Sequence, residues 1–591
     1  MTAIYKAALW LSLLLTCALP LRGQHLTEAI RLNQVGFYPN APKVAVVVGA
    51  EAGKFFITTP DLAKTVFTGE LGAQQYADLS FQQTRIADFS GFTAAGTFVI
   101  WIPNLGFSHP FQIKAGVHDE VARAAVKAFY YQRVSTPLPA AYAGIWSRPL
   151  GHPDNQVLIH PSAASAQRPA GSTISSTRGW YDAGDYNKYI VNSGITLGTM
   201  LSLYEDFPEY CSKVSLNIPE SSNRLPDLLD ESLWNLRWML TMQDPNDGGV
   251  YHKLTNASFD GMVMPSEAKA PRYVVQKSTA AALDFAAVMA QASRIFKKFN
   301  KQAPGLADTC LRASTRAWAW AQANPAVLYE QGALNKQFQP PVSTGTYGDR
   351  TVSDELIWAA AELYAATKQD SYYKAVNLYP NEQTPLPSWG QVRTLAYYTL
   401  ARLGNDLTPL AKKDMPQLKT RLLAMADNLA NGSSTRAYQT VMGKDAGDYN
   451  WGSNANAANQ GIALVQAYKL SGDRKYLLYA LTNLDYLLGR NATGYSYVTG
   501  YGAKSPQHPH HRPSEADGVR EPIPGLLVGG PNPGRQDGCH YASTLPDMAY
   551  TDEMCSYASN EIAINWNAPL VYLAGALEAV QGQAGFSKAA K

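Results

Sequence analysis

The segment Gly179–Tyr186 (GWYDAGDY) carries two carboxylates, Asp182 and Asp185, three residues apart. The small residues between them favour a tight turn from which both side chains can point the same way. Close carboxylates raise one another's pKa and can hold a water molecule between them, which suits a general base in hydrolysis. Aspartate is also a common helix cap, so the spacing alone leaves both interpretations open.

A second copy of the string DAGDYN complicates this interpretation. It spans residues 445–450 and is followed by WGSN at 451–454. The six-residue string is identical in the two copies, so by itself it does not show which copy carries the catalytic aspartates.

Glu561 is a second candidate for acid–base chemistry. It follows Tyr550, Asp552 and Tyr557 and opens an apolar stretch that continues as a helix. A carboxyl group among aromatic rings tends to have a raised pKa, as a general acid needs. Taken alone, however, a Glu in the first turn of a helix is the better explanation, because the helix dipole favours it there.

Two further clusters carry ligand-type side chains. The loop His508–Arg512 (HPHHR) suits hydrogen bonding to hydroxyl groups, although a solvated basic loop explains it equally well. A zinc site there would need more ligands at suitable spacing. Asp349, Asp354 and Glu355 offer hard oxygen ligands close in sequence, which fits Ca²⁺, with a helix cap near residue 354 as the alternative.

The elements that must position these side chains fall into two classes. Residues from about 28 to 115 are short, β-branched segments punctuated by Gly, Pro and Asn, which predicts a small β-sandwich. From about Val117 helical patterns dominate, and helical hairpins repeat at 363–375 and 466–480, which indicates stacked or ring-closed α/α packing. The long segment 490–560, rich in Gly, Pro, His and aromatics, is expected to form functional loops.

The composition narrows the class of function. With 46% apolar and 16% charged residues in 591, a large core is expected and a disordered chain is excluded. The net charge of +3 is spread out without a Lys/Arg-rich run, which argues against nucleic-acid binding. The 34 Tyr and 12 Trp, many in loop-like segments, suit the apolar faces of sugars.

The N-terminus is typical of an export signal, with an apolar stretch at Ala7–Leu19 and cleavage expected near Gly23. No later segment is long and apolar enough to predict a membrane span. Cys539 and Cys555 lie close enough in sequence to form a disulfide in an oxidising compartment, and free thiols are equally compatible with the sequence.

Four blocks together resemble glycoside hydrolase family 9, the inverting cellulases with an (α/α)6 barrel. They are RLNQVGFYP at 31–39, GWYDAGDYNKYIVNSG at 179–194, SYVTGYGAKSPQHPHHR at 496–512 and YTDEMCSYASNEIAINWNA at 550–568. The resemblance implies a mainly α protein with a signal peptide at 1–23, an immunoglobulin-like β-sandwich at 24–116 and a barrel at 117–591.

The resemblance also assigns roles. It selects the motif copy flanked by Gly-Trp and Lys-Tyr, so that Asp185 resembles the general base, Asp182 its water-holding partner and Glu561 the general acid. His510 and Arg512 resemble the hydroxyl-binding pair of the cleft.

Other site residues follow from the same resemblance. Tyr186 and Trp566 are further expected substrate contacts, and Trp566 replaces a tyrosine of some members, which leaves substrate preference open. Asp349, Asp354 and Glu355 lie where many members bind structural calcium. Catalysis itself is expected to need no cofactor. Many members with the β-sandwich carry a Cys/His zinc site before the base block, whereas here only His152 and His160 remain, so no zinc is expected.

The implied activity is that of a secreted or periplasmic endo-β-1,4-glucanase that acts on cellulose-type glucan with inversion. An exo-acting glucosidase or glucosaminidase, or an enzyme for xyloglucan or mixed-linkage glucan, would share all these motifs. A glycan-binding protein built on an inactive hydrolase is the non-enzyme alternative. The oligomeric state is left open.

Overall fold

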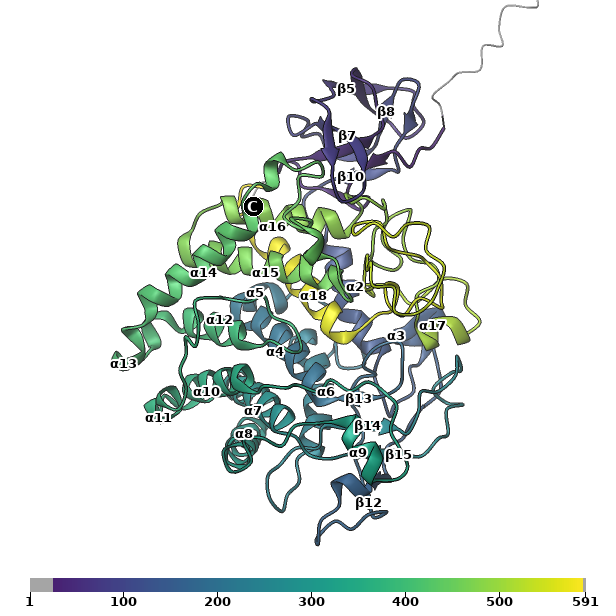
Figure 1. Ribbon diagram of the computed structural model, residues 1–591. Coiled ribbons are helices and arrows are strands. Elements are labelled where there is room, and N and C mark those ends of the chain that lie inside the picture. The colour runs from purple at the N-terminus through teal and green to yellow at the C-terminus, as the bar shows by residue number, and fades with distance from the viewer. Residues whose placement is uncertain (1–24, 588–591) are drawn as a thin grey trace, which may run out of the picture.

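The computed structural model describes residues 25–587. The predicted signal peptide at 1–23 lies outside them. A β-rich domain at the N-terminal end packs on a larger helical domain, as Figure 1 shows.

The β-rich domain is a sandwich of two sheets. One has the strand order β1-β3-β7-β6, and the other has the order β2-β10-β8-β4-β5 with β9 paired to β8. Inward-facing Phe55, Ile57, Ile100 and Phe111 form its core. The strands are β1 Ile30–Arg31, β2 Gly36–Phe37, β3 Val44–Val48, β4 Lys54–Thr58, β5 Thr65–Glu70, β6 Gln75–Ala77, β7 Gln82–Asp88, β8 Gly96–Ile102, β9 Gly106–Phe107 and β10 Phe111–Ile113.

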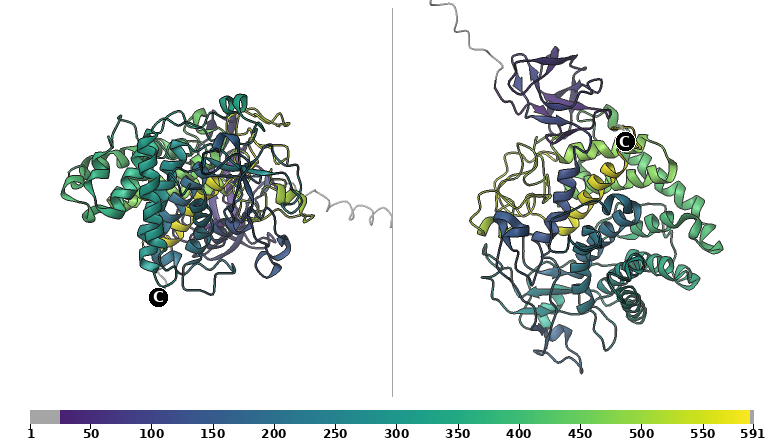
Figure 2. Two further views of the ribbon diagram at one scale, coloured as in Figure 1. Left: turned by 90° about the horizontal axis from the view of Figure 1, so that it is seen from below. Right: turned by 180° about the vertical axis from the view of Figure 1, so that it is seen from behind.

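The β-rich domain packs on the helical one, as the right view of Figure 2 shows, and polar contacts hold the two together. Asn33 Nδ2 donates to Asp485 Oδ1 at 2.8 Å, and the Tyr38 hydroxyl donates to Glu578 Oε1 at 2.8 Å. All four side chains are buried, so the two domains meet through a closed interface rather than a free linker.

The helical domain contains long helices joined by short turns and by long loops. The longer helices are α2 Asp119–Tyr131, α4 Ile190–Asp206, α6 Asp227–Thr241, α7 Thr279–Phe296, α8 Leu306–Ala323, α10 Ser353–Thr367, α12 Arg393–Leu403, α14 Met415–Ala430, α15 Ser453–Ser471, α16 Lys475–Leu487 and α18 Ile564–Val580. The shorter ones are α3 Ala140–Ala143, α5 Pro208–Cys211, α9 Gln331–Gln337, α11 Asp370–Lys374, α13 Pro409–Lys412 and α17 Arg512–Ala516.

The helices pack in two layers. Most residues of α4, α7, α15 and α18 are buried, as expected for helices enclosed by other elements. Helix α4 packs between α7 and α18, α10 packs on α7 and α12, and α15 packs on α18. The more amphipathic α8, α14 and α16 cover these helices from outside. The repeated helical hairpins predicted at 363–375 and 466–480 are confirmed as α10–α11 and α15–α16.

A small sheet and a long loop region lie at one end of the helices and carry the candidate site. The sheet has the order β12-β11-β15-β14-β13, and its strand β13 leads directly into α4. Its strands are β11 Val157–Ile159, β12 Thr173–Ile174, β13 Lys188–Tyr189, β14 Lys253–Asn256 and β15 Arg272–Val274. The long loop region lies between α16 and α18. None of the helices within residues 25–587 has the length and apolar character to cross a membrane.

Candidate active site

A cleft of about 1060 Å³ brings the predicted carboxylates together. Asp182, Asp185 and Glu561 all line it, although Glu561 lies far from the other two in sequence. The remaining walls come from the loop before α10, the start of α15 and the loops on either side of α17. A large hollow with a few converging polar groups is the usual form of a binding site.

Asp182 is held rigidly beneath the cleft. Its Oδ1 accepts a hydrogen bond from Asn192 Nδ2 at 2.7 Å, and its Oδ2 accepts one from the Tyr347 hydroxyl at 2.8 Å. Only 1% of the residue is exposed. Burial and the adjacent Asp185 carboxylate raise the pKa of Asp182 above its ordinary value.

Asp185 is held on one oxygen only. Asn187 Nδ2 and the Tyr189 hydroxyl both donate to its Oδ2, at 2.6 Å and 3.2 Å. Its Oδ1 has no hydrogen-bond partner among the described residues. That oxygen is therefore available to a water molecule. Helix α4 begins only at Ile190, with Tyr189 at its cap, so the helix-cap interpretation of the two aspartates is wrong.

Glu561 lies across from the aspartate pair, in the segment that precedes α18. Its Oε1 accepts a hydrogen bond from the Gly184 backbone N–H at 3.3 Å, and its backbone pairs with that of His510. Burial and the charges of Asp185 and Asp182 raise the pKa of Glu561 well above 4.5, which favours the protonated form that a general acid needs. Helix α18 starts at Ile564, which removes the first-turn explanation for Glu561.

His510 and Arg512 line the same cleft in fixed orientations. His510 Nδ1 bonds the Met554 carbonyl at 2.7 Å, and burial lowers the pKa of the ring so that it stays neutral. The Arg512 guanidinium donates to the carbonyls of Gly184 and Asp260 at 2.7–3.0 Å. Arg512 is buried rather than solvated, so the basic-loop interpretation is wrong.

Comparison with known proteins agrees with this geometry. Residues 118–574 match the family model described as glycosyl hydrolase family 9. The chain belongs to glycosyl hydrolase family 9. Residues 25–106 match the model described as cellulase N-terminal ig-like domain, so the β-sandwich is the immunoglobulin-like domain that the sequence predicts.

Individual relatives cover nearly the whole chain. A xyloglucan-specific endo-β-1,4-glucanase from Bacteroides ovatus is 49% identical over 555 residues, 94% of each protein. Endoglucanase D from Acetivibrio thermocellus is 34% identical over 92% of this chain and 83% of its own length. A solved family 9 structure from Bacteroides ovatus superposes with a TM-score of 0.90 at 47% identity, covering 94% of this chain and all of that one. The protein is therefore a glycoside hydrolase.

The two predicted aromatic contacts of this family 9 enzyme differ in position. Trp566 lines the cleft. Tyr186 does not line it; its ring is buried behind the aspartate turn, and its hydroxyl donates to the Val263 carbonyl at 2.6 Å. The residue after Asp185 therefore supports the turn from behind.

Several further aromatic side chains line the cleft that are not among the site residues predicted from the sequence. They are Phe259, Tyr347 and Trp389, together with Trp451, whose ring lies 5.6 Å from that of Tyr557. The WGSN block that contains Trp451 was the only available signal. These rings provide the apolar faces on which pyranose units stack.

The second DAGDYN copy has a structural role. Asp445 accepts from the Gly447 backbone N–H at 2.8 Å, and Asp448 accepts from the backbones of Gly443 and Lys444 and from Gln460. These bonds shape the turn before α15, and neither aspartate lines the cleft.

The predicted calcium residues lie beside the cleft at the start of α10. Within residues 25–587 no group of three or more His, Cys, Asp or Glu side chains is arranged to hold a metal ion. Asp354 Oδ2 instead accepts from the Val392 backbone N–H at 2.8 Å. Both carboxylate oxygens of Glu355, and both of the neighbouring Asp284, are nevertheless buried without a hydrogen-bond partner in the described part of the chain.

The loop that precedes the acid is closed covalently. Cys539 and Cys555 form a disulfide with their Cα atoms 5.9 Å apart, which confirms the bridged alternative. The crosslink restrains the segment that leads to Tyr557 and Glu561.

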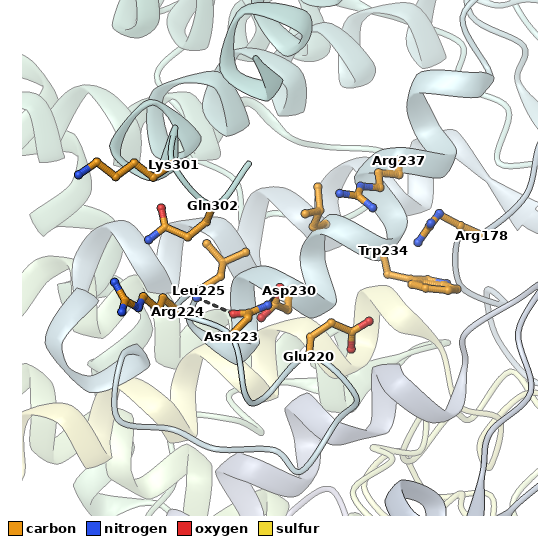
Figure 3. Close-up of a pocket in the computed structure, with 11 residues that line it drawn as sticks. Arg178, Glu220, Asn223, Arg224, Leu225, Asp230, Trp234, Arg237, Lys301 and Gln302 are labelled. Carbon is orange, nitrogen blue, oxygen red and sulfur yellow. Dashed lines mark hydrogen bonds between the residues drawn. The ribbon is translucent and has the colours of Figure 1, made fainter. Parts of the chain in front are cut away.

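A second hollow, of about 530 Å³, lies on the outer side of α6 (Figure 3). Its acidic groups are already engaged, because Glu220 makes a two-bonded ion pair with Arg133, and Asp230 accepts from Asn223. Arg178, Arg224, Arg237 and Lys301 make its rim basic. Because its two carboxylates, Glu220 and Asp230, are held in these structural contacts, this hollow is not assigned as the hydrolytic site.

Proposed function

We propose that this protein is an inverting endo-β-1,4-glucanase. The observation that carries the proposal is the meeting of Asp185, Asp182 and Glu561 in one open cleft, with the pKa of Glu561 raised and one oxygen of Asp185 free. The endoglucanases among its relatives support the same activity.

The mechanism follows from the positions of these carboxyl groups and the raised pKa of Glu561. Glu561 would protonate the glycosidic oxygen of the bond that breaks. Asp185 would take a proton from a water molecule on the opposite face of the sugar, with Asp182 helping to hold that water. In inverting enzymes the two carboxyl groups stand about 6.5–9.5 Å apart, which leaves room for this water.

His510, Arg512 and the aromatic rings would place the sugar chain. The neutral His510 ring keeps Nε2 for a sugar hydroxyl, since Nδ1 is bound to a carbonyl. Trp451, Trp566 and Phe259, which line the cleft, would stack on glucose units of the chain.

Within this proposal the helical domain is an (α/α)6 barrel that spans 117–591 and follows an immunoglobulin-like domain at 24–116. The inner helices would be α4, α7, α10, α12, α15 and α18. The packing of α4 on α7 and α18, and of α10 on α7 and α12, supports this arrangement. Residues 1–23 would act as a signal peptide that directs the protein to the periplasm or the medium, and the disulfide supports export to an oxidising compartment.

Xyloglucan is the favoured natural substrate among β-1,4-glucans. The specific observation is the 49% identity over 94% of both chains to a xyloglucan-specific enzyme. A cleft wide enough to admit branched chains would serve unbranched ones too, so cellulose-type and mixed-linkage glucans are the comparison substrates.

A structural calcium ion is part of the proposal. Asp349, Asp354 and Glu355 would hold it, and it would balance buried negative charge at the start of α10 without entering the reaction. The unpartnered buried oxygens of Glu355 and Asp284 support a missing cation, since uncompensated buried carboxylates are costly.

The decisive experiment measures viscosity loss against new reducing ends on xyloglucan, carboxymethylcellulose and mixed-linkage β-glucan, with Glu561→Gln as control. A fast viscosity drop with few new ends, absent in the variant, is the expected result. Release of monomer or dimer without a viscosity drop would favour an exo-acting enzyme. Binding without any product would favour the glycan-binding protein.

A further inference from the structure

Lys253 is buried behind the aspartate turn. It opens β14, where its backbone pairs with that of Tyr189 on β13, and none of its surface is exposed. Burial of an ammonium group costs free energy unless an opposite charge or hydrogen bonds compensate for the lost water. Lys253 makes no ion pair with any carboxylate in the described residues.

Neutral oxygens satisfy the ammonium group instead. Lys253 Nζ donates to Gln331 Oε1 at 2.7 Å, to Thr344 Oγ1 at 2.9 Å and to the Gly345 carbonyl at 2.6 Å. The three N–H groups are thereby used, which fixes the charge in one position.

One hydrogen-bonded chain leads from this charge to Asp185. Thr344 Oγ1 lies 2.6 Å from Thr255 Oγ1, and Thr255 Oγ1 lies 3.0 Å from Asn187 Oδ1. Asn187 Nδ2 then donates to Asp185 Oδ2 at 2.6 Å. Every donor in this chain can point from the ammonium toward the carboxylate, so each bond polarises the next.

A second branch reaches the same oxygen. The Gly345 N–H donates to the Tyr189 hydroxyl at 3.1 Å, and that hydroxyl donates to Asp185 Oδ2 at 3.2 Å. Gly345 also accepts from Lys253 through its carbonyl, so the two branches are anchored at one place.

We propose that Lys253 is a positioning residue for the hydrolytic reaction, which orients the Asp185 carboxylate by engaging its Oδ2 through the Thr344–Thr255–Asn187 chain. Oδ1 is then the oxygen that takes the proton from water. The predicted effect on turnover rests on the proposed function. The electrostatic link between Lys253 and Asp185 does not, because it can be measured without substrate.

Other charged groups also act on these two side chains. The charge of Asp185 raises the pKa of both Asp182 and Glu561, whereas burial lowers the pKa of His510 and Arg512 is bound to carbonyl groups. Burial lowers the pKa of Lys253 to about 7, while Asp185 acts to raise it.

The rings packed on Lys253 carry no charge. Its Nζ lies 5.5 Å from the ring centre of Tyr189 and 5.4 Å from that of Tyr329. Below pH 7 Lys253 is therefore the cation that the hydrogen-bonded chain connects to the base.

The test is Lys253→Met, which keeps the length of the side chain and removes its charge. We expect kcat on the best β-glucan to fall about tenfold, with KM within about twofold, because the base is affected and substrate contacts are not. The acidic limb of the kcat/KM profile should move to higher pH by about one unit, since Asp185 loses a nearby cation.

Lys188→Met is the matched control. Lys188 lies on the neighbouring strand β13, is equally buried, and pairs with Asp154 at 2.7 Å rather than with the hydrogen-bonded chain. It should lower thermal stability and leave the acidic limb in place. An acidic limb that moves equally in both variants, or in neither, would overturn the proposal.

Two further measurements guard against misfolding of Lys253→Met and against inactivity of the parent. Thr255→Val removes the hydroxyl that links Thr344 to Asn187. The double variant should therefore have nearly the same kcat as Lys253→Met alone, because both changes break the same chain. A ¹³C carboxyl titration of Asp185, assigned by the signal lost in Asp185→Asn, should show a higher pKa in Lys253→Met than in the parent. An unchanged titration rejects this inference, whereas a parent inactive on every glucan rejects the proposed function alone.

Discussion

Gly184 lies against the carbonyl group of His510 so closely that a Cβ atom at position 184 would stand 2.1 Å from the His510 oxygen. The peptide of Gly184 also donates its N–H to Glu561 and offers its carbonyl to Arg512. One glycine therefore joins the base turn, the histidine loop and the acid, and only the absence of a side chain allows all three to meet.

Gly184→Ala should consequently push the two carboxylate segments apart. A backbone oxygen cannot give way like a flexible side chain, so we expect at least a tenfold loss of kcat and a lower Tm, since misplacement by about 1 Å is enough for a large loss. Gly447→Ala in the second motif copy is the control, because its new Cβ would meet only the side chain of Asp445. The measurement compares kcat and Tm of Gly184→Ala and Gly447→Ala with those of the parent. Equal losses in the two variants would contradict the close packing of Gly184 on His510.

The two motif copies also allow a direct test of the base. Asp185→Asn should lower kcat by about 10²–10⁴-fold, the usual contribution of a general base. Asp448→Asn changes the matching residue of the second copy, which shapes a turn outside the cleft, and should cost some stability with little loss of turnover. Comparable losses of kcat in the two variants would refute the assignment of Asp185.

Local patterns predicted most of the elements. The β-rich region near 28–115 and the helical hairpins at 363–375 and 466–480 agree with expectation, because alternating or helical apolar spacing is a property of the segment itself. The carboxylates were found by type and spacing. Choosing between the two DAGDYN copies needed their flanking residues, because the string itself is identical.

Features that depend on packing between distant segments were not predictable. Lys253 is connected to Asp185 through Thr344, and Tyr347 donates to Asp182 from a loop far away in the sequence. Tyr186 is an example of the opposite error. It directly follows the base in sequence, but in the irregular turn its ring lies behind the cleft. Adjacency in sequence does not fix the direction of a side chain outside regular structure.

The raised pKa of Glu561 predicts two pH effects. Activity requires the protonated acid, so kcat/KM should fall as pH rises through that raised pKa. Between the unfolded value of 4.5 and the folded pKa, the native state binds more protons than the unfolded one, so stability should fall as pH rises. In Glu561→Gln the Tm should depend less on pH over this window, as scanning calorimetry at several pH values would show. An unchanged slope would mean that Glu561 is ionised in the native enzyme.

Removal of divalent cations tests the calcium proposal. Dialysis against EDTA should lower Tm by a few degrees and added Ca²⁺ should restore it, because a ligand that binds only the folded state stabilises it. Glu355→Gln should abolish this response, whereas Glu382→Gln should keep it, since the Glu382 side chain is fully exposed away from the cluster. A Tm that is indifferent to EDTA in the parent would show that the buried carboxylates are protonated rather than metal-bound.

Trp451 should hold a sugar unit distant from the bond that breaks. It lines the cleft, is 44% exposed and is braced by the ring of Tyr557, whose hydroxyl donates to the Gln536 carbonyl. Loss of one aromatic platform costs about 1 kcal/mol, so Trp451→Ala should raise KM for long oligosaccharides roughly five- to tenfold with little change in kcat. Short oligosaccharides that do not reach Trp451 should be cleaved as before. Phe81→Ala, an exposed aromatic on the β-sandwich, is the control, and an equal KM for short and long chains in Trp451→Ala would exclude a sugar contact at this residue.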